Sequence, residues 1–119
     1  MLNKIILSVL ISSLFCTNIV FAKNAKHVTK EKDGQKYYLN RCSSCHGAGS
    51  RGGNLYSINE WERIFSKNGI ELLELHEGED DVQDVIEYIK SDSFKLENKN
   101  MLNFIQEFAY DSELIPTCY

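Results

Sequence analysis

Two cysteines and a histidine with the potential for metal or covalent chemistry stand together at Cys42, Cys45 and His46, in the run NRCSSCHGAG. If this run is helical, the cysteines lie one turn apart and the histidine follows directly. The spacing is compatible with a disulfide, a redox dithiol, part of a zinc site or covalent haem attachment. Other features of the sequence bear differently on these four chemistries.

A disulfide between the two cysteines leaves His46 without a role, and thioredoxin-like chemistry requires a βαβ setting that the sequence does not show. A structural zinc ion needs about four protein ligands, and beyond the motif the candidates are few: His27, His76 and Cys118. By contrast, C-x-x-C-H is the signature of c-type haem attachment. In that interpretation Cys42 and Cys45 bond to the two vinyl groups of a porphyrin, and His46 is the proximal axial ligand of the iron. Haem is the favoured interpretation, with zinc and a disulfide left open.

Residues 1–22 are typical of a secretory signal peptide, with Lys4 before an apolar run and Ala22 at the cleavage position. An uncleaved membrane anchor is an alternative, and so is a lipoprotein at Cys16, although Phe15 is large for such a site. Cleavage leaves 97 residues, and with them three cysteines, an odd number that does not form a complete disulfide framework. A covalent apolar cofactor would supply the core that so small an exported domain otherwise lacks.

The charges are unevenly distributed. Without the first 22 residues the chain has twelve Lys and Arg against seventeen Asp and Glu, a formal charge of −5. Seven basic residues fall within 23–51, whereas 71–87 holds eight acidic residues and no Lys or Arg. This asymmetry favours a dipolar protein that orients on a charged partner, although an ordinary solvated surface is also compatible. We expect no nucleic-acid ligand for a net-acidic exported chain.

The hydrophobic periodicity predicts an all-α fold, because no segment alternates at period two for long enough to form a strand. We expect a flexible leader over 23–32, a haem domain over 33–91 and a helical extension over 92–119. The expected helices are one that starts at 33 and carries the motif at its end, one from Asn59 to Gly69 with Glu62 completing a capping box, one over 79–91 and one over 96–110. The glycine-rich segment after the motif is predicted to be a loop.

The run YYLNRCSSCHG, followed by glycines, resembles the start of a bacterial class I c-type cytochrome. The resemblance covers about residues 33–91 and implies a small helical domain wrapped around one covalent haem c. It also implies that the helix DVIEYIK, residues 84–90, packs across the first helix with Tyr88 at the crossing. The implied function is single-electron transfer between redox proteins in the periplasm, without enzymatic activity. The chain departs from the family in lacking a proline after the motif and a Met-Pro dipeptide, the usual site of the sixth ligand.

In the family, the distal ligand lies on a loop before the helix that crosses the first one, and this places His76 at the distal position. Met101 is the alternative, and His27 or an empty sixth position also stays open. Two imidazoles imply a lower potential than imidazole plus thioether. Six apolar residues are expected to form the pocket wall: Tyr56, Trp61, Phe65, Leu72, Leu73 and Leu75.

Three functions follow from these alternatives: a periplasmic electron carrier, a haem enzyme or ligand sensor with an open sixth position, and a zinc-binding or metal-free interaction module. The carrier requires transient docking to redox partners. Contact with a membrane is expected only through an uncleaved or lipidated N-terminus. Once the motif cysteines are bonded, Cys118 is left over, and we expect it to be a free thiol.

Overall fold

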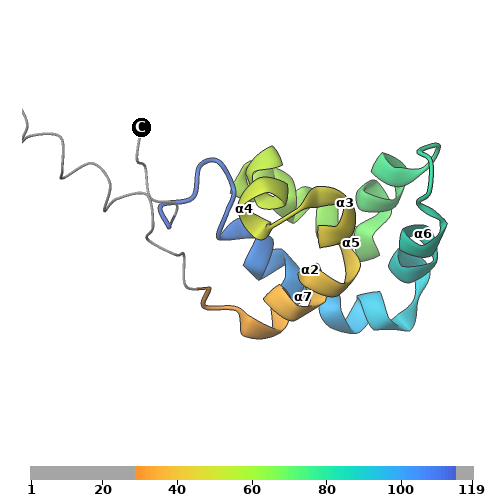
Figure 1. Cartoon of the computed structure of the whole chain (residues 1–119), viewed down its shortest axis with the longest axis horizontal. Coiled ribbons are helices and arrows are strands. Elements are labelled where there is room, and N and C mark those ends of the chain that lie inside the picture. Colours follow the sequence, from red (N-terminus) through yellow and green to blue (C-terminus); the bar gives the residue numbers. More distant parts are fainter. Residues whose placement is uncertain (1–28, 115–119) are drawn as a thin grey trace, which may run out of the picture. The chain divides into compact units, whose positions relative to one another are not determined.

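The computed structural model describes residues 29–114. Helix α2 (Lys32–Arg41) leads into the motif and packs against the last helix, α7 (Asp92–Gln106) (Figure 1). Gly34 is buried at this contact, and a Cβ added there would overlap the carbonyl of Asn100 and lie 2.8 Å from Cβ of Phe104. One turn later, the ring of Tyr38 packs 5.4 Å from that of Phe104. The close approach of α2 and α7 therefore depends on a glycine.

This contact contradicts one implication of the resemblance. The helix predicted to pack across the first helix was residues 84–90, but α7 packs along α2 instead. Tyr88 meets the end of α2 through Arg41, whose guanidinium carbon lies 4.3 Å from the centre of the Tyr88 ring. The helix at the start of the predicted extension is thus a wall of the main core.

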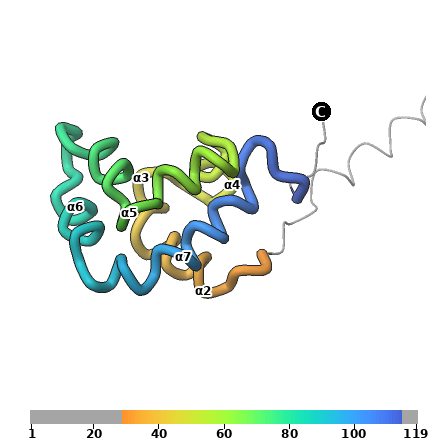
Figure 2. The backbone as a smooth tube through the Cα atoms, turned by 180° about the vertical axis from the view of Figure 1, so that it is seen from behind, coloured from red at the N-terminus to blue at the C-terminus, as the bar shows by residue number. Residues whose placement is uncertain are grey.

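The prediction of an all-α fold is confirmed for residues 29–114, which contain about six helices and no strand. Together these residues form a compact globule (Figure 2). Between α2 and α7 lie five further elements: α3 (Ser43–His46), α4 (Gly49–Gly52), the 3₁₀ helix η2 (Gly53–Leu55), α5 (Ile58–His76) and α6 (Gln83–Lys90). Helix α7 also packs against α5 and α6, so it contacts most of the helical elements.

Several predicted boundaries were wrong. The glycine-rich segment is not a loop throughout, because it contains α4 and η2. Helix α5 begins two residues earlier than predicted: Ser57, not Asn59, is the N-cap, and its hydroxyl accepts a hydrogen bond from the amide of Glu60 at 3.1 Å. Glu60 accepts one from the Ser57 amide at 2.8 Å, which completes the capping box. Helix α6 begins four residues later than predicted and α7 four residues earlier.

Helix α5 is interrupted rather than ended near Gly69. Ser66 is extended, and Lys67, Asn68 and Gly69 all have left-handed backbone angles, with φ of 51°, 56° and 74°. We call residues 58–65 the first arm of α5 and residues 70–76 the second arm. The predicted stop is therefore a turn between two helical arms.

The core lies between α5 and α7. Its fully buried large side chains are Ile64, Phe94, Met101 and Phe104. Phe94 packs its ring 6.1 Å from that of Phe65 and 5.6 Å from that of Tyr88. Because each fully buried large apolar side chain contributes about 1.5–3 kcal/mol, this cluster is a main source of stability.

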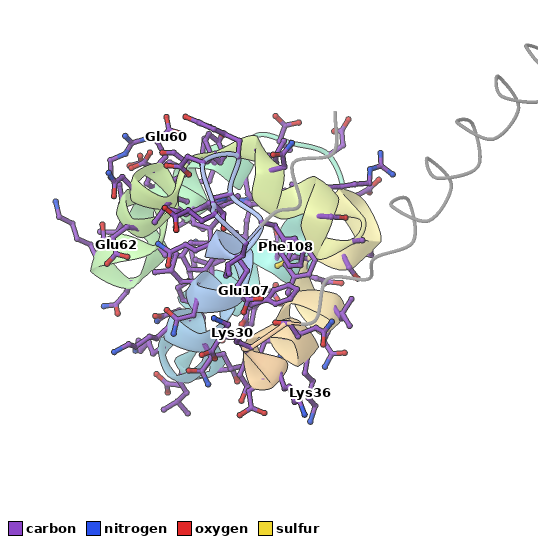
Figure 3. All side chains as sticks on the ribbon, turned by 90° about the vertical axis from the view of Figure 1, so that its left-hand side faces the viewer. Lys30, Lys36, Glu60, Glu62, Glu107 and Phe108 are labelled. Atoms are coloured by element: carbon purple, nitrogen blue, oxygen red, sulfur yellow. The ribbon has the colours of Figure 1, made fainter. Side chains whose placement is uncertain are left out.

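The residues before α2 are hydrogen-bonded to the end of α7. The carboxylate of Glu107 is buried and accepts hydrogen bonds from the amides of Lys30 and Glu31 and from the hydroxyl of Thr29, each at 3.1 Å (Figure 3). These donors belong to the end of the segment predicted as a flexible leader. The carboxylate ties that segment to the helical core.

The predicted signal peptide, the rest of the leader with His27, and Cys118 lie outside the described residues. In the part of the chain that the structure describes, no helix is both long and apolar enough to cross a bilayer.

Candidate functional site

The motif forms a single helical turn. Cys42 breaks the α2 geometry, with φ −122° and ψ −31°, and caps α3. Its carbonyl accepts hydrogen bonds from the amides of Cys45 at 3.3 Å and His46 at 3.0 Å. Gly47 ends the turn with φ 73°, a left-handed conformation that favours glycine. The turn therefore places Cys42, Cys45 and His46 within about one helical turn of each other.

Tyr38 fixes the end of this turn. Its buried hydroxyl donates to the carbonyl of Gly47 at 2.8 Å. Gly52 lies against the same hydroxyl, and a Cβ there would overlap it and approach Cβ of His46 to 3.3 Å. Burial raises the pKa of Tyr38 to about 12, so it stays a hydrogen-bond donor at neutral pH. The histidine of the motif is thus held by packing from α2 and α4.

The two cysteines have different surroundings. Both are free thiols, which gives the disulfide interpretation no support. Cys42 is half-buried, and its Sγ lies 3.7 Å from Sδ of Met101. Burial raises the pKa of the Cys42 thiol to about 12. Cys45, in contrast, is exposed. One sulfur faces the core and the other faces solvent.

His76 is the last residue of α5, and its ring lies next to that of His46. The two ring centroids are 6.1 Å apart, with the ring planes at 82°. Nδ1 of His76 lies 2.7 Å from the carbonyl oxygen of Leu72. A carbonyl only accepts, so this contact favours a proton on Nδ1 and leaves Nε2 as the nitrogen that can coordinate a metal. Desolvation, and then the neighbouring His76, lower the pKa of His46, which favours its neutral, metal-binding form.

A cavity of about 450 Å³ adjoins both histidines and the two cysteines. This volume falls within the range of roughly 300–1,000 Å³ that is typical of cofactor pockets. Five of the six predicted wall residues line it, and Leu73 does not. Its further lining includes Tyr38, Leu55, Val82, Val85, Tyr88, Ile89, Phe94, Met101 and Ile105. The lining is therefore mainly apolar.

Met101, the alternative ligand, has a different position from that of His76. It lies within α7, is fully buried and contacts Cys42. It also lines the cavity. The thioether of Met101 contacts Cys42, whereas the ring of His76 lies next to the ring of His46.

The distance between the two imidazole rings is compatible with one shared metal ion. Two rings on opposite sides of a metal have centroids roughly 6 Å apart, since each metal–nitrogen bond is roughly 2 Å and each ring adds about 1 Å. The observed 6.1 Å agrees with this separation. Within residues 29–114 no three His, Cys, Asp or Glu side chains gather as a metal site.

A cluster beside the motif was not found from the sequence. Tyr88 donates to Glu97 at 2.6 Å, and Nε of Arg41 lies 3.7 Å from the same carboxylate. Burial, and then the hydrogen bond to Glu97, raise the pKa of Tyr88. Arg41 and Tyr88 both line the cavity. The basic residue Arg41 directly before the motif was the one feature of the sequence that could have indicated this cluster. Its partners Tyr88 and Glu97, however, are 47 and 56 residues away in the chain.

Comparison with known proteins adds no relative: no family model, curated protein or solved structure matches this chain.

Proposed function

We propose that the chain binds one haem, held by Cys42 and Cys45 through thioether bonds and by His46 and His76 as axial ligands, and carries single electrons between redox proteins. The observation that supports this most directly is the pair of neighbouring imidazoles, with ring centroids 6.1 Å apart, beside an apolar cavity. The resemblance of the motif to class I c-type cytochromes points the same way. Met101 is the alternative to His76.

The chain's own residues orient the ligands and exclude water. When bound, haem supplies an iron that takes up and releases one electron. The turn from Cys42 to Gly47 fixes His46, and the carbonyl of Leu72 leaves Nε2 of His76 free to coordinate. The buried rings of Trp61 and Phe65 keep one wall of the cavity dry. A rigid, apolar enclosure reduces the rearrangement that accompanies each electron transfer.

Partners would dock where the cavity meets the surface. Cys45 is exposed there, and the lining residues Leu55 and Leu75 are 55% and 46% exposed. Glu79 and Asp80, also part of the lining, are exposed carboxylates. An apolar rim with negative charge suits brief contact with a partner of positive surface potential, for which a small interface is sufficient. With residues 1–22 as an export signal, the proposed location is the periplasm.

A haem enzyme or small-ligand sensor is the second candidate. The observation that favours it is the position of His76 at the end of a helical arm, where it is only partly buried. A ligand in that position can leave more easily than one held within the motif turn. An open sixth position would then admit a small molecule to the iron.

Expression of the full chain in a host that attaches c-type haem tests both candidates. We expect pigment that stays with the protein in acid acetone, and an electron paramagnetic resonance spectrum of low-spin ferric iron with two imidazoles. We also expect no spectral change when carbon monoxide is added to the dithionite-reduced protein. High-spin ferric iron that binds carbon monoxide after reduction would favour the sensor, and protein without covalent pigment would refute both.

A further inference from the structure

The turn inside α5 brings distant residues to one cavity. Trp61 and His76 are fifteen residues apart, so a straight helix would separate them by roughly 22 Å. In the structure both line the same cavity, Trp61 from the first arm and His76 from the second. The change of direction at residues 66–69 therefore determines where His76 lies.

Gly69 is required in this turn for two independent reasons. Its φ of 74° is a conformation that L-residues adopt at a cost. In addition, a Cβ at this position would lie 2.7 Å from the ring of Phe94 and 3.4 Å from a methyl of Ile89. Phe94 is fully buried between the rings of Phe65 and Tyr88, so it has little room to move. The backbone of Gly69 thus packs directly against a tightly packed part of the core.

Gly69 directly precedes the second arm, and His76 is the last residue of that arm. The hydrogen bond that orients His76 also lies within this arm, because its acceptor is the carbonyl of Leu72. The ring and its acceptor are therefore carried by the same short helical segment.

We propose that Gly69 is a positioning residue that seats the second arm against Phe94 and so places His76 opposite His46; this rests on the proposed haem function. A methyl group at residue 69 must move from 2.7 Å to at least 3.4 Å from the ring, a shift of 0.7 Å. Functional geometry tolerates displacements of only about 0.5 Å. The shift would therefore weaken coordination by His76.

The test compares Gly69→Ala with Asn68→Ala in the haem-loaded full chain. Asn68 has φ 56° but is exposed, so alanine there faces the same left-handed conformation without the contact to Phe94. We expect ferric Gly69→Ala to lose most of the low-spin signal. After reduction, the variant should bind carbon monoxide at least about tenfold more tightly than the wild type, a change in binding free energy of about 1.4 kcal/mol. Asn68→Ala should retain the wild-type spectrum. A wild-type spectrum in Gly69→Ala, or the same loss in both variants, overturns the proposal.

If the Gly69→Ala protein does not accumulate, the contact between Gly69 and Phe94 is tested by changing Phe94 instead. Phe94→Leu removes the ring on which Gly69 rests, and Phe65→Leu truncates a neighbouring ring that also lines the cavity but is not among the nearest atoms to Gly69. We expect carbon monoxide affinity to rise about tenfold more in Phe94→Leu than in Phe65→Leu. Equal effects overturn the proposal.

The spectrum of the wild-type protein distinguishes a failure of the proposed His76 ligation from a failure of the proposed role of Gly69. A wild-type protein without the two-imidazole signal refutes the assignment of His76, and the role of Gly69 falls with it. A wild-type protein with that signal, together with an unaffected Gly69→Ala variant, refutes the role of Gly69 alone.

Discussion

Replacement of Met101 and His76 should separate a packing side chain from an iron ligand, because both line the cavity but the ring of His76 lies next to that of His46. Met101 is fully buried. Truncation of a buried methionine to alanine costs about 2–5 kcal/mol, whereas the exchange for leucine conserves volume and costs less than about 1.5 kcal/mol. Met101→Leu should therefore fold almost normally although it lacks a thioether.

The assay is the spectrum of the ferric haem protein together with its unfolding by urea. We expect Met101→Leu to keep the low-spin spectrum and Met101→Ala to keep it with a free energy of unfolding lower by about 2–5 kcal/mol. His76→Ala should convert the ferric iron to a high-spin form and, after reduction with dithionite, should bind carbon monoxide. Loss of the low-spin signal in Met101→Leu, with an unchanged spectrum in His76→Ala, would refute the assignment.

Three further predictions concern the fold. Gly34→Ala should lower the free energy of unfolding by about 1–3 kcal/mol through overlap with α7, and the exposed Leu39→Ala should change it by less than about 0.5 kcal/mol in the same urea titration. Glu107→Ala should cost on the order of 3 kcal/mol, because three donors lose their acceptor; wild-type stability would show that these bonds do not hold the segment. In the haem-free protein, Cys42 stays protonated until about pH 12, whereas in the unfolded chain it ionises near 9.0, so stability should fall as pH rises between these values, by up to about 4 kcal/mol. Urea unfolding at pH 8 and pH 11 should show about 3 kcal/mol of this loss, and an equal loss in Cys42→Ser would assign it to another group.

The local features of the site could be predicted from the sequence because they depend on neighbouring residues. A helical turn through Cys42, Cys45 and His46 follows from their spacing, and Gly47 ends it with the backbone angle that glycine favours. The apolar wall from Trp61, Phe65 and Leu72 follows from helical periodicity. Each of these features is decided within a few residues of chain.

The long-range arrangement could not be predicted in the same way. Two helices, α6 and α7, carry similar apolar faces, and which of them packs along α2 depends on Gly34 meeting the backbone at Asn100. That complementarity joins residues 66 positions apart and leaves no local signal. The turn in α5 is a similar case: Lys67 and Asn68 have no sequence feature that requires left-handed angles, and the packing of Gly69 on Phe94 supplies the reason. Tertiary contact overrode local preference at both places.

The two histidines differ in how firmly the fold holds them, and this difference connects the two candidate functions. In the proposed holoprotein, His46 stands in a turn tethered by two thioether bonds and braced by Tyr38. His76 ends a helical arm that joins the core through a left-handed turn, and it has no tether of its own. If one axial bond breaks, it is therefore the bond to His76 that gives way. Electron carriage and the binding of a small ligand would then be two states of the same site, and the seating of the second arm on Phe94 sets the balance between them.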